Sequence, residues 1–596
     1  MKKIMAPRYT AGQGFFDKAF FDCYKGIGYP DRWLEESQTY APEDAYVISH
    51  PTWFYEAIPE VPEISIYELF ARTVKKYPDD VAVIFLDKAV TYGELDLMIR
   101  KYAAFLKEIG IGKNSVVATM LPNSLQHIVA FYAAAFVGAV HTPIDVMFKP
   151  KEIADQLKDS RARVILVLDQ WHEKLVDLKA DGLIDHEIVT HLQDWIAPKA
   201  VVPSTLKLCW DMPKRAIAGT FDFFASMEKH APLTEPEKVD PRKDAALLLY
   251  TAGTTGKNKG VLETHFNLVF NSLTHTHAFR ATREREVNFS IMPMFHTSGY
   301  LLHQLPVFYQ GGTVIPIPLF DAADAFRIIE TYRVNVIFAP PTFFIALMNQ
   351  NELMKKHDLS SIQMTIGCAA PVPVAVQDQW KQMTGLELVN GWGMTETNSG
   401  GIISIPGIKE KFDSIGIPVY SEVKITDEMG NILGRNQEGE ICYRGLQVAA
   451  GYYNNPRETE MTFLPDGWLR TGDKGFVDKE DFVHFAGRIK HLIVVSGYNV
   501  SPVEVEHVLY LHPGVEEAMV TGQHDPYQGE KVKATISLKL DYMDKISEQD
   551  IMDFCKKHLA SYKVPKIVDF RDILPKSPTG KLMRQDHNKD DDPMGL

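Results

Sequence analysis

Residues 250–260, YTAGTTGKNKG, combine the groups that bind phosphate: closely spaced glycines, four hydroxyl groups and two lysines. Glycines let backbone N–H groups turn toward phosphate oxygens, and threonine hydroxyls add further donors. The spacing differs from the P-loop pattern G-x-x-x-x-G-K-[ST], because no glycine pair at that spacing is followed by lysine and then serine or threonine. The stretch therefore predicts phosphate chemistry of another kind, against the alternative of a mobile surface turn.

A second stretch, NGWGMTET at residues 390–397, offers groups that suit the rest of a nucleotide. A base can stack on the Trp392 ring, the Thr395 hydroxyl can reach a phosphate, and the Glu396 carboxylate can hold Mg²⁺. Taken singly, these residues are typical of a buried tryptophan and a solvated glutamate. Together with the first stretch they indicate a nucleotide site.

Composition excludes several other classes of protein. The 596 residues are enough for about three or four domains, and the formal net charge of −14 argues against a nucleic-acid coat. The five cysteines lie far apart with no C-x-x-C pair, so neither a zinc site nor a disulfide framework is expected, and a cytoplasmic location fits best. The N-terminal MKKIMAPRYTAGQG lacks the apolar run of a secretory signal.

Alternating helix and strand patterns begin at Ile64 and return between Asn267 and Val389, which predicts parallel sheets with crossover helices. The longest apolar run, Ile128 to Val140, is too short to span a bilayer and predicts a buried helix. Residues 170–230 are less regular and contain several prolines, so we expect an insertion or a mobile excursion there. His275 and His277 would share one face of a strand, but no third ligand is evident, so no metal site is expected.

Five stretches then occur in a fixed order: YTAGTTGKNKG, PMFHTSG, GWGMTE, GWLRTGDKGFVDKEDFVHFAGRIK and PKSPTGK. In these stretches, and over nearly all of residues 64–581, the sequence resembles the adenylate-forming superfamily of acyl-CoA synthetases, peptide-synthetase adenylation domains and luciferases. The resemblance implies an α/β fold: a large N-terminal domain of two doubly wound α/β subdomains and a small β-barrel, followed by a mobile C-terminal α+β domain. The expected parts are an N-terminal extension (1–62), an AMP-binding domain (63–488, with the barrel at about 415–488) and the mobile domain (489–596).

The same resemblance assigns roles to individual residues. The first loop is expected to hold the β- and γ-phosphates of ATP, and Asp473, assisted by Arg488, to bind the ribose hydroxyls. The segment from Cys368 to Pro373 should flank adenine, although many relatives have glycine where Cys368 stands. The implied ATP-binding residues are Thr251, Gly253, Thr254, Thr255, Gly256, Lys259, Ala370, Pro371, Trp392, Thr395, Asp473, Arg488 and Lys581.

Lys581 matches the catalytic lysine of the superfamily, and electrostatics agrees. A carboxylate must approach an anionic phosphate, and two unit charges about 4 Å apart interact by roughly 4 kcal/mol at an effective dielectric near 20. A lysine that bridges both groups offsets this repulsion. His296 is expected at the mouth of the acyl pocket, with a satisfied core histidine as the alternative. The implied catalytic residues are Lys581, Thr395, Glu396 and His296; the metal ligand is Glu396; the acyl pocket contains His296, Tyr300, Gly391 and Gly393.

The implied reaction is the ATP-dependent joining of a carboxylic acid to coenzyme A, with Mg²⁺ as cofactor. Adenylation by Lys581 comes first, the small domain then rotates about Lys490, and Gly497 faces the site for thioester formation. Relatives carry lysines where this chain has Val494 and Ser496, which leaves the contacts to the CoA phosphates open. Alternatives are an aryl-acid CoA ligase, adenylation with another acceptor such as a carrier protein, a luciferase-like oxygenase, and a non-catalytic binding protein, which would lose Lys581 or Glu396.

The substrate prediction rests on Gly393. Acetate-specific relatives carry a tryptophan there, whose indole closes the pocket, so glycine predicts a deeper pocket for medium- to long-chain fatty or cyclic acids. Apolar residues at 299–302 and 338–341 are expected to line it. No acidic residue that could bind an amino-acid substrate follows Phe295 in PMFHTSGYLL. The expected partners are the acid, ATP and CoA, without nucleic acid or a transmembrane segment. The sequence leaves open the acid itself, the oligomeric state, peripheral membrane contact and the direction of flux.

Overall fold

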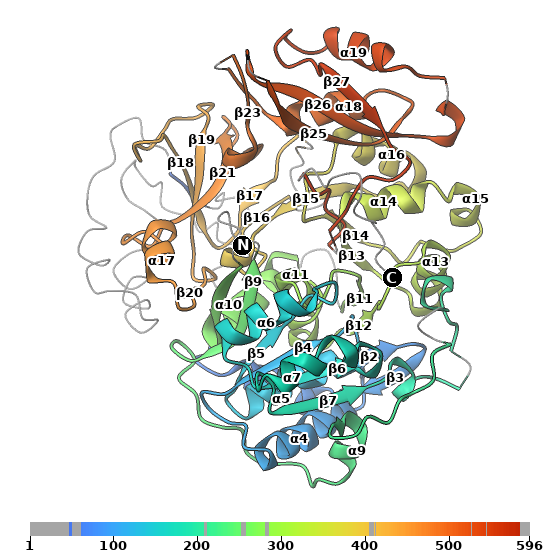
Figure 1. Ribbon diagram of the computed structural model, residues 1–596, viewed down its shortest axis with the longest axis vertical. Helices are drawn as coiled ribbons and strands as arrows, with labels where there is room; N and C mark the ends of the chain where they lie inside the picture. The colour runs from blue at the N-terminus through green and yellow to red at the C-terminus, as the bar shows by residue number, and fades with distance from the viewer. Residues whose placement is uncertain are drawn as a thin grey trace, which may run out of the picture.

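The computed structural model describes residues 47–49, 61–198, 200–207, 211–251, 258–279, 285–404, 411, 413–496, 498–525, 527–543, 545–577 and 579–584. Most of the expected N-terminal extension lies outside these residues, as do Gly253, Thr254, Thr255 and Gly256 of the phosphate loop and Gly497. Figure 1 shows two sheet-and-helix layers in the lower and central parts of the molecule, with the C-terminal region above them.

The first layer is an eight-stranded sheet of order β20-β10-β9-β5-β4-β6-β7-β8. Its parallel centre consists of β5 (Val140–Pro143), β4 (Val116–Met120) and β6 (Val164–Leu168). Helix α5 (Leu125–Phe136) is buried along its whole length, because both its faces are apolar. The predictions of parallel strands and of a buried helix in the long apolar run are thus confirmed.

The expectation for residues 170–230 is wrong in part, because this segment extends the sheet. Strand β7 (His186–Thr190) pairs in parallel with β6, and β8 (Phe221–Asp222) pairs with β7. Helix α9 (Phe223–Glu228) packs against α4 (Tyr92–Glu108). The strand signal was weak because β7 is short and contains His186 and Glu187, whereas the prolines lie in the connections.

The second layer is a nine-stranded sheet in which β13 (Val336–Ala339), β14 (Met364–Gly367) and β15 (Leu388–Trp392) run in parallel. Alternate residues of β13 face opposite sides: Phe338 packs with residues of α10 (His265–Phe279), and Ile337 packs with residues of α16 (Val374–Thr384). The carboxyl ends of the three strands bring residues 339–341, 367–371 and 392–396 to one edge, where α/β sheets bind ligands.

Helix α10 also corrects the argument about His275 and His277. Both residues lie on this helix and not on a strand, so the premise of a shared strand face is wrong. Among the described residues, no group of three His, Cys, Asp or Glu side chains is arranged to hold a metal ion.

The predicted small barrel consists of a five-stranded antiparallel sheet of order β1-β18-β19-β21-β22. Strand β1 (Val47–Ser49) comes from the N-terminal segment and pairs with β18 (Glu422–Thr426). The other strands are β19 (Gly439–Arg444), β21 (Leu469–Val477) and β22 (Val483–Arg488). This sheet presents the Asp473 and Arg488 side chains to the edge described above.

A fourth sheet begins after Arg488 and has its own hydrophobic core. It contains β23 (Ile493–Val495), β24 (Tyr498–Val500), β25 (Val515–Asp525), β26 (Gly529–Leu538) and β27 (Ile567–Phe570), with helices α18 (Pro502–Tyr510) and α19 (Glu548–Lys556). Thr342 donates to the Gly580 carbonyl at 3.3 Å and Asn349 donates to Glu516 at 2.5 Å, so this region covers the carboxyl edge of the second sheet (Figure 1). No described helix is long and apolar enough to cross a membrane.

Candidate active site

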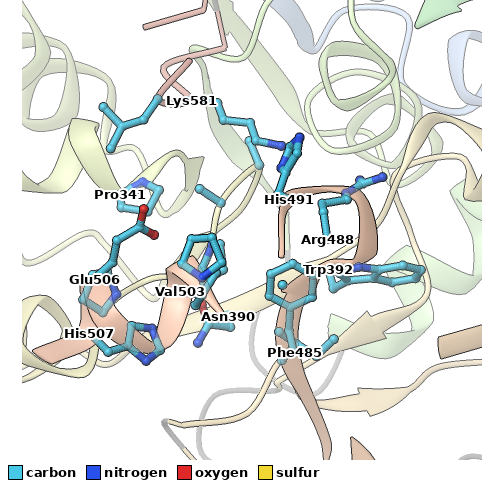
Figure 2. A pocket seen from close by; sticks show the side chains of 18 of the residues that line it. Pro341, Asn390, Trp392, Phe485, Arg488, His491, Val503, Glu506, His507 and Lys581 are labelled. Atoms are coloured by element: carbon cyan, nitrogen blue, oxygen red, sulfur yellow. The ribbon is translucent and has the colours of Figure 1, made fainter. Parts of the chain in front are cut away.

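A cavity of about 140 Å³ lies between the C-terminal region and the carboxyl edge of the second sheet (Figure 2). Its walls come mainly from four places: the loops after β13, β14 and β15, the end of β22 with the turn that follows, helix α18, and the segment around Lys581. It brings together eight residues that the sequence predicted: Ala370, Pro371, Gly391, Trp392, Gly393, Asp473, Arg488 and Lys581.

Asp473 and Arg488 are directly paired across β21 and β22, which explains their spacing in the sequence. Arg488 Nε lies 2.7 Å from Asp473 Oδ1, and Trp392 Nε1–H donates to Asp473 Oδ2 at 2.8 Å. Asp473 is fully buried, and this burial raises its pKa, while Arg488 and then Trp392 oppose the rise. The carboxylate is thus held in one orientation at the cavity wall.

Lys581 projects into the cavity from a tight turn. The Ser577 N–H donates to the Lys581 carbonyl at 2.8 Å, and the Lys581 N–H donates to Ser577 Oγ at 3.2 Å. Gly580 has φ +73°, and a Cβ there would lie 2.7 Å from Pro340 Cγ, so only glycine fits. The ammonium is accessible to water but enclosed by protein, and this partial desolvation, together with Arg488, lowers the pKa of Lys581 to about 8, against the influence of Asp473.

Thr395 and Glu396 lie on a short 3₁₀ helix (Thr395–Thr397) and are both buried. Tyr452 OH donates to Glu396 Oε1 at 2.7 Å, and the Ala449 N–H donates to the Glu396 carbonyl at 2.9 Å. These contacts fix the carboxylate beside β20 (Gly451–Tyr452). Neither residue is part of the cavity lining around Lys581.

Glu263, which the sequence analysis did not single out, is a second buried carboxyl close to Glu396. It lies on β10 (Lys259–Thr264) and is fully buried, and among the described residues neither of its oxygens has a hydrogen-bond partner of normal geometry. Burial raises its pKa well above the usual value, Asn398 opposes the rise, and the charge of Glu396 adds to it.

The described ends of the phosphate loop are Thr251 and Lys259, which are direct partners of the antiparallel pair β9 (Ala245–Thr251) and β10. The Lys259 ammonium forms an ion pair with Glu458 on α17 (Pro456–Thr462) and lies 5.1 Å from the centre of the Tyr452 ring. Sequence reasoning missed Glu458, because 199 residues separate it from its partner.

His296 caps helix α11 (Thr297–Leu301), where its Nδ1 accepts from the Ser298 N–H at 3.4 Å. Burial, with a contribution from Lys581, lowers the pKa of His296 to about 4, so the ring is neutral and lies within electrostatic reach of the catalytic candidate. His296 is not part of the described cavity lining.

Tyr300 is fully buried and does not line the cavity around Lys581. Its hydroxyl is 2.7 Å from His127 Nε2 and 3.0 Å from His141 Nδ1, and its ring packs against Phe131 of α5. Sequence reasoning missed these partners because they come from distant parts of the chain. The place of Tyr300 in the acyl pocket stays a prediction.

The two predicted pocket glycines differ in their surroundings. A Cβ at Gly391 would lie 3.2 Å from Ile366 Cγ2, a side-chain atom. A Cβ at Gly393 would lie 2.5 Å from both the carbonyl carbon and the oxygen of Ser399, which are backbone atoms. The absence of a side chain at Gly393 is therefore already required by packing.

Further cavity residues come from the C-terminal half of the chain. Arg584 donates to the Val520 carbonyl at 3.1 Å and pairs with Glu506 at 2.7 Å, which ties the Lys581 segment to α18. His491 follows the exposed Lys490 in a 3₁₀ turn (Ile489–His491). The only feature of the sequence that could have pointed to His491 as a site residue is its position next to Lys490, the expected hinge. The cavity residues missed by sequence reasoning include Phe485, His491, Glu506, His507 and Arg584.

Comparison with known proteins agrees with this geometry. The chain matches the AMP-binding enzyme family over residues 70–453 and the AMP-binding enzyme C-terminal domain over residues 504–581. It is 34% identical to a long-chain-fatty-acid–CoA ligase of Bacillus subtilis over 537 residues, covering 88% of this chain and 94% of the relative. It is 32% identical to the ligase of the same name from Escherichia coli O157:H7 over 536 residues, with the same coverage.

Solved structures show the same similarity. The anthranilate CoA ligase AuaEII with anthranoyl-AMP matches with a TM-score of 0.79 and 26% identity, over 88% of this chain and 97% of that one. A benzoate CoA ligase from Burkholderia xenovorans LB400 matches with a TM-score of 0.76 and 25% identity, over 87% and 99% of the two chains. The family match covers most of the chain, and six of the nucleotide-binding candidates (Ala370, Pro371, Trp392, Asp473, Arg488 and Lys581) line one cavity. The chain belongs to the AMP-binding enzyme family.

Proposed function

We propose that this protein joins medium- to long-chain fatty or cyclic carboxylic acids to coenzyme A. It is an AMP-forming acid–thiol ligase that uses ATP and Mg²⁺. A carboxylate oxygen attacks the α-phosphorus of ATP, the bond from that phosphorus to the bridging oxygen breaks, and pyrophosphate leaves. The CoA sulfur then attacks the acyl carbon of the adenylate, the acyl C–O bond breaks, and AMP leaves while the thiol proton passes to solvent.

The observation that carries the proposal is the position of Lys581 in one cavity with Trp392, Asp473 and Arg488. Asp473 can accept from both ribose hydroxyls, and the Lys581 ammonium can meet the approaching carboxylate and the α-phosphate together. At neutral pH Lys581 is mostly protonated, since its pKa is about 8. A lysine poised in this way offsets the charge repulsion at the reacting atoms.

The surroundings of Glu396 fit a magnesium ion. Carboxylate oxygens are the ligands that this hard cation prefers, and the Tyr452 hydroxyl holds Oε1 so that Glu396 is oriented before any ion arrives. Mg²⁺ bound there would neutralise phosphate charge during adenylation. Thr251 and Lys259 stand at the two ends of the loop proposed to hold the β- and γ-phosphates.

The choice of a fatty acid follows the relatives from Bacillus subtilis and Escherichia coli, which are named long-chain-fatty-acid–CoA ligases. Leu302 and Phe338 lie in one apolar cluster with Ile366 beside Gly391, which supports an apolar acyl channel at this place. An aryl acid is the second candidate, because the anthranilate ligase aligns along nearly its whole length.

Domain movement is also part of the proposal. The domains are residues 63–488 and 489–596, with 1–62 as an extension, and Lys490 is the hinge. Rotation there exchanges Lys581 for the segment around Gly497, which then lines the CoA site. The change of sheet between β22 and β23 supports a hinge at this point. A cytoplasmic location accords with the free, buried thiols of Cys368, Cys442 and Cys555.

The test separates the two half-reactions in Lys581→Ala. Pyrophosphate release with a panel of acids should fall about a hundredfold or more, whereas thioester formation from synthetic acyl-adenylate and CoA should be retained. Lys576→Ala is the matched control, because Lys576 lies in the same segment but pairs with Glu517 at 2.7 Å. Equal losses in both half-reactions would exclude the proposed role of Lys581.

A further inference from the structure

His491 occupies a central place in the cavity wall that none of the predicted roles uses. It ends the 3₁₀ turn directly after Lys490, at the point where the chain passes from one proposed domain to the other. Figure 2 shows the His491 ring and the Lys581 side chain pointing toward one another from opposite sides of the cavity. The two residues come from segments 90 positions apart in the sequence.

The four charges that act most strongly on His491 are positive. They belong to Lys490 and Arg488 on its own side of the cavity, and to Lys581 and Arg584 on the C-terminal segment. The nearby carboxylates are already engaged, since Asp473 pairs with Arg488 and Glu506 pairs with Arg584. Among the described residues, no carboxylate lies within ion-pair distance of Lys581. A fifth positive charge at residue 491 would therefore be strongly opposed.

His491 is consequently a neutral neighbour in a cationic site. Burial, reinforced by Lys490, Arg584, Lys581 and Arg488 in that order, lowers its pKa to about 4. The ring therefore carries no charge near pH 7. A neutral imidazole can contact the Lys581 ammonium without pairing its charge, whereas a carboxylate at the same position would form an ion pair and compete with substrate for the ammonium.

We propose that His491 is a positioning residue for Lys581: its neutral ring faces the lysine side chain in the cavity and leaves the ammonium charge free for the carboxylate and the α-phosphate. This inference rests on the proposed function and adds a determinant of Lys581 chemistry to it. His491 and Lys581 both follow the hinge at Lys490 and belong to the same proposed domain, so the two side chains would move together when that domain rotates. Their coupling bears on the first half-reaction, because that is the step in which Lys581 acts.

The consequence is that the charge at position 491 sets the pKa of Lys581. His491→Asp should raise that pKa by about one unit or more, as an opposite charge at close range does. His491→Lys should lower it, because it adds a like charge. His491→Gln, which is neutral and polar, should leave it near the wild-type value. A His491 side chain that lies away from Lys581 predicts no such ordering by charge, because the effect falls with distance.

The primary experiment measures Lys581 directly and needs no enzymatic activity. Amine-selective acetylation of the folded protein across a pH series, with quantification of the Lys581 peptide by mass spectrometry, gives the pKa of this lysine in wild type and in the three variants. Lys576, which pairs with Glu517, is the internal reference within the same segment. Circular dichroism verifies that each variant is folded. If His491→Asp does not fold, the comparison of His491→Lys with wild type decides the question.

We expect the pKa of Lys581 to be highest in His491→Asp, intermediate in wild type and His491→Gln, and lowest in His491→Lys. The pH at which pyrophosphate release begins to fall should shift in the same order. The pH dependence of thioester formation from acyl-adenylate should not change. The inference is overturned if the pKa of Lys581 is the same in the folded Asp, Gln and Lys variants. It is also overturned if that pKa shifts while the pH dependence of the adenylation rate stays unchanged. If the labelling shifts but wild type releases no pyrophosphate with any acid, the proposed function fails while the coupling stands.

Discussion

Trp392 Nε1–H donates a 2.8 Å hydrogen bond to Asp473 Oδ2, and this bond joins the nucleotide stretch of the second sheet to the antiparallel sheet. The donor leaves Asp473 with a fixed orientation toward the ribose position. Trp392→Phe keeps an aromatic ring for the base but removes the donor. Because a hydrogen bond to a charged group contributes about 1.5–3 kcal/mol, we expect KM for ATP to rise about tenfold or more.

Steady-state kinetics with varied ATP measure this effect. Asp473→Asn and the double variant complete a cycle that isolates the interaction between the two side chains. Additive effects in that cycle, with no coupling between residues 392 and 473, would contradict the orienting role of the hydrogen bond.

Glu396→Gln is expected to raise the Mg²⁺ concentration needed for half-maximal adenylation. A neutral amide is a poorer ligand for a hard cation than a carboxylate. Tyr452→Phe removes the hydrogen bond to Oε1 but keeps the carboxylate, so it should have a smaller effect in the same direction. The measurement is a Mg²⁺ titration at fixed ATP, and an unchanged half-saturation point in Glu396→Gln would show that Glu396 does not bind the metal.

Adenylation should slow as the pH rises through about 8. The pKa of Lys581 is lowered to about 8, so the ammonium loses its proton within this window and with it the charge that offsets repulsion. Above that pH the rate should fall about tenfold per unit, as for any step that needs one protonated group. The test compares initial rates of pyrophosphate release with rates of thioester formation from acyl-adenylate across this pH range. If both half-reactions lose rate at high pH, the loss belongs to a group other than Lys581.

Much of this site could be predicted from sequence because its parts are local. Glycines and threonines within residues 250–260 identify phosphate chemistry before any fold is known. The ring, hydroxyl and carboxylate within residues 390–397 identify a nucleotide site in the same way. Helix α4 likewise follows from its apolar spacing and from Thr91 and Glu94, which cap it reciprocally. The parallel sheets follow from the alternation of such segments.

The remaining features depend on contacts between distant segments. Nothing near Lys259 indicates that Glu458 will pair with it, and nothing near Tyr300 indicates that its hydroxyl meets His127 and His141. His491 acquires its cationic surroundings only because the C-terminal segment folds back over the cavity. Such pairings are set by packing of whole layers, which local patterns do not encode.

Glu263 should cost the protein stability. Neither of its buried oxygens has a hydrogen-bond partner of normal geometry in the part of the chain that the structure describes, and an unsatisfied buried polar group costs about 1–3 kcal/mol. Glu263→Leu replaces it with an apolar side chain on an already buried strand, so Tm should rise by a few degrees. Glu263→Gln, which keeps a polar group there, should gain less. Thermal unfolding followed by calorimetry measures both, and a lower Tm in the Leu variant would mean that the carboxyl has a stabilising partner.

The acyl pocket should be narrowed at Gly391 and not at Gly393. A tryptophan at Gly393 cannot simply fill the channel, because its Cβ would strike the Ser399 backbone at 2.5 Å and force the chain to move. A methyl at Gly391 meets Ile366 Cγ2 at 3.2 Å, which a small side-chain adjustment relieves, and the Gly367 carbonyl oxygen at an ordinary 3.8 Å. Gly391→Ala therefore tests pocket depth in a folded enzyme.

Each buried methylene contributes about 0.8 kcal/mol, so lost channel space should penalise long acids more than short ones. We expect wild type to prefer octanoate, cyclohexanecarboxylate or palmitate over acetate. In Gly391→Ala, kcat/KM for these larger acids should fall several-fold, while the low activity with acetate changes little. Gly393→Ala is the comparison: its backbone clash should reduce activity with all acids alike and lower Tm. A wild-type preference for acetate, or equal losses across all four acids in Gly391→Ala, would rule out an acyl channel that passes beside Ile366.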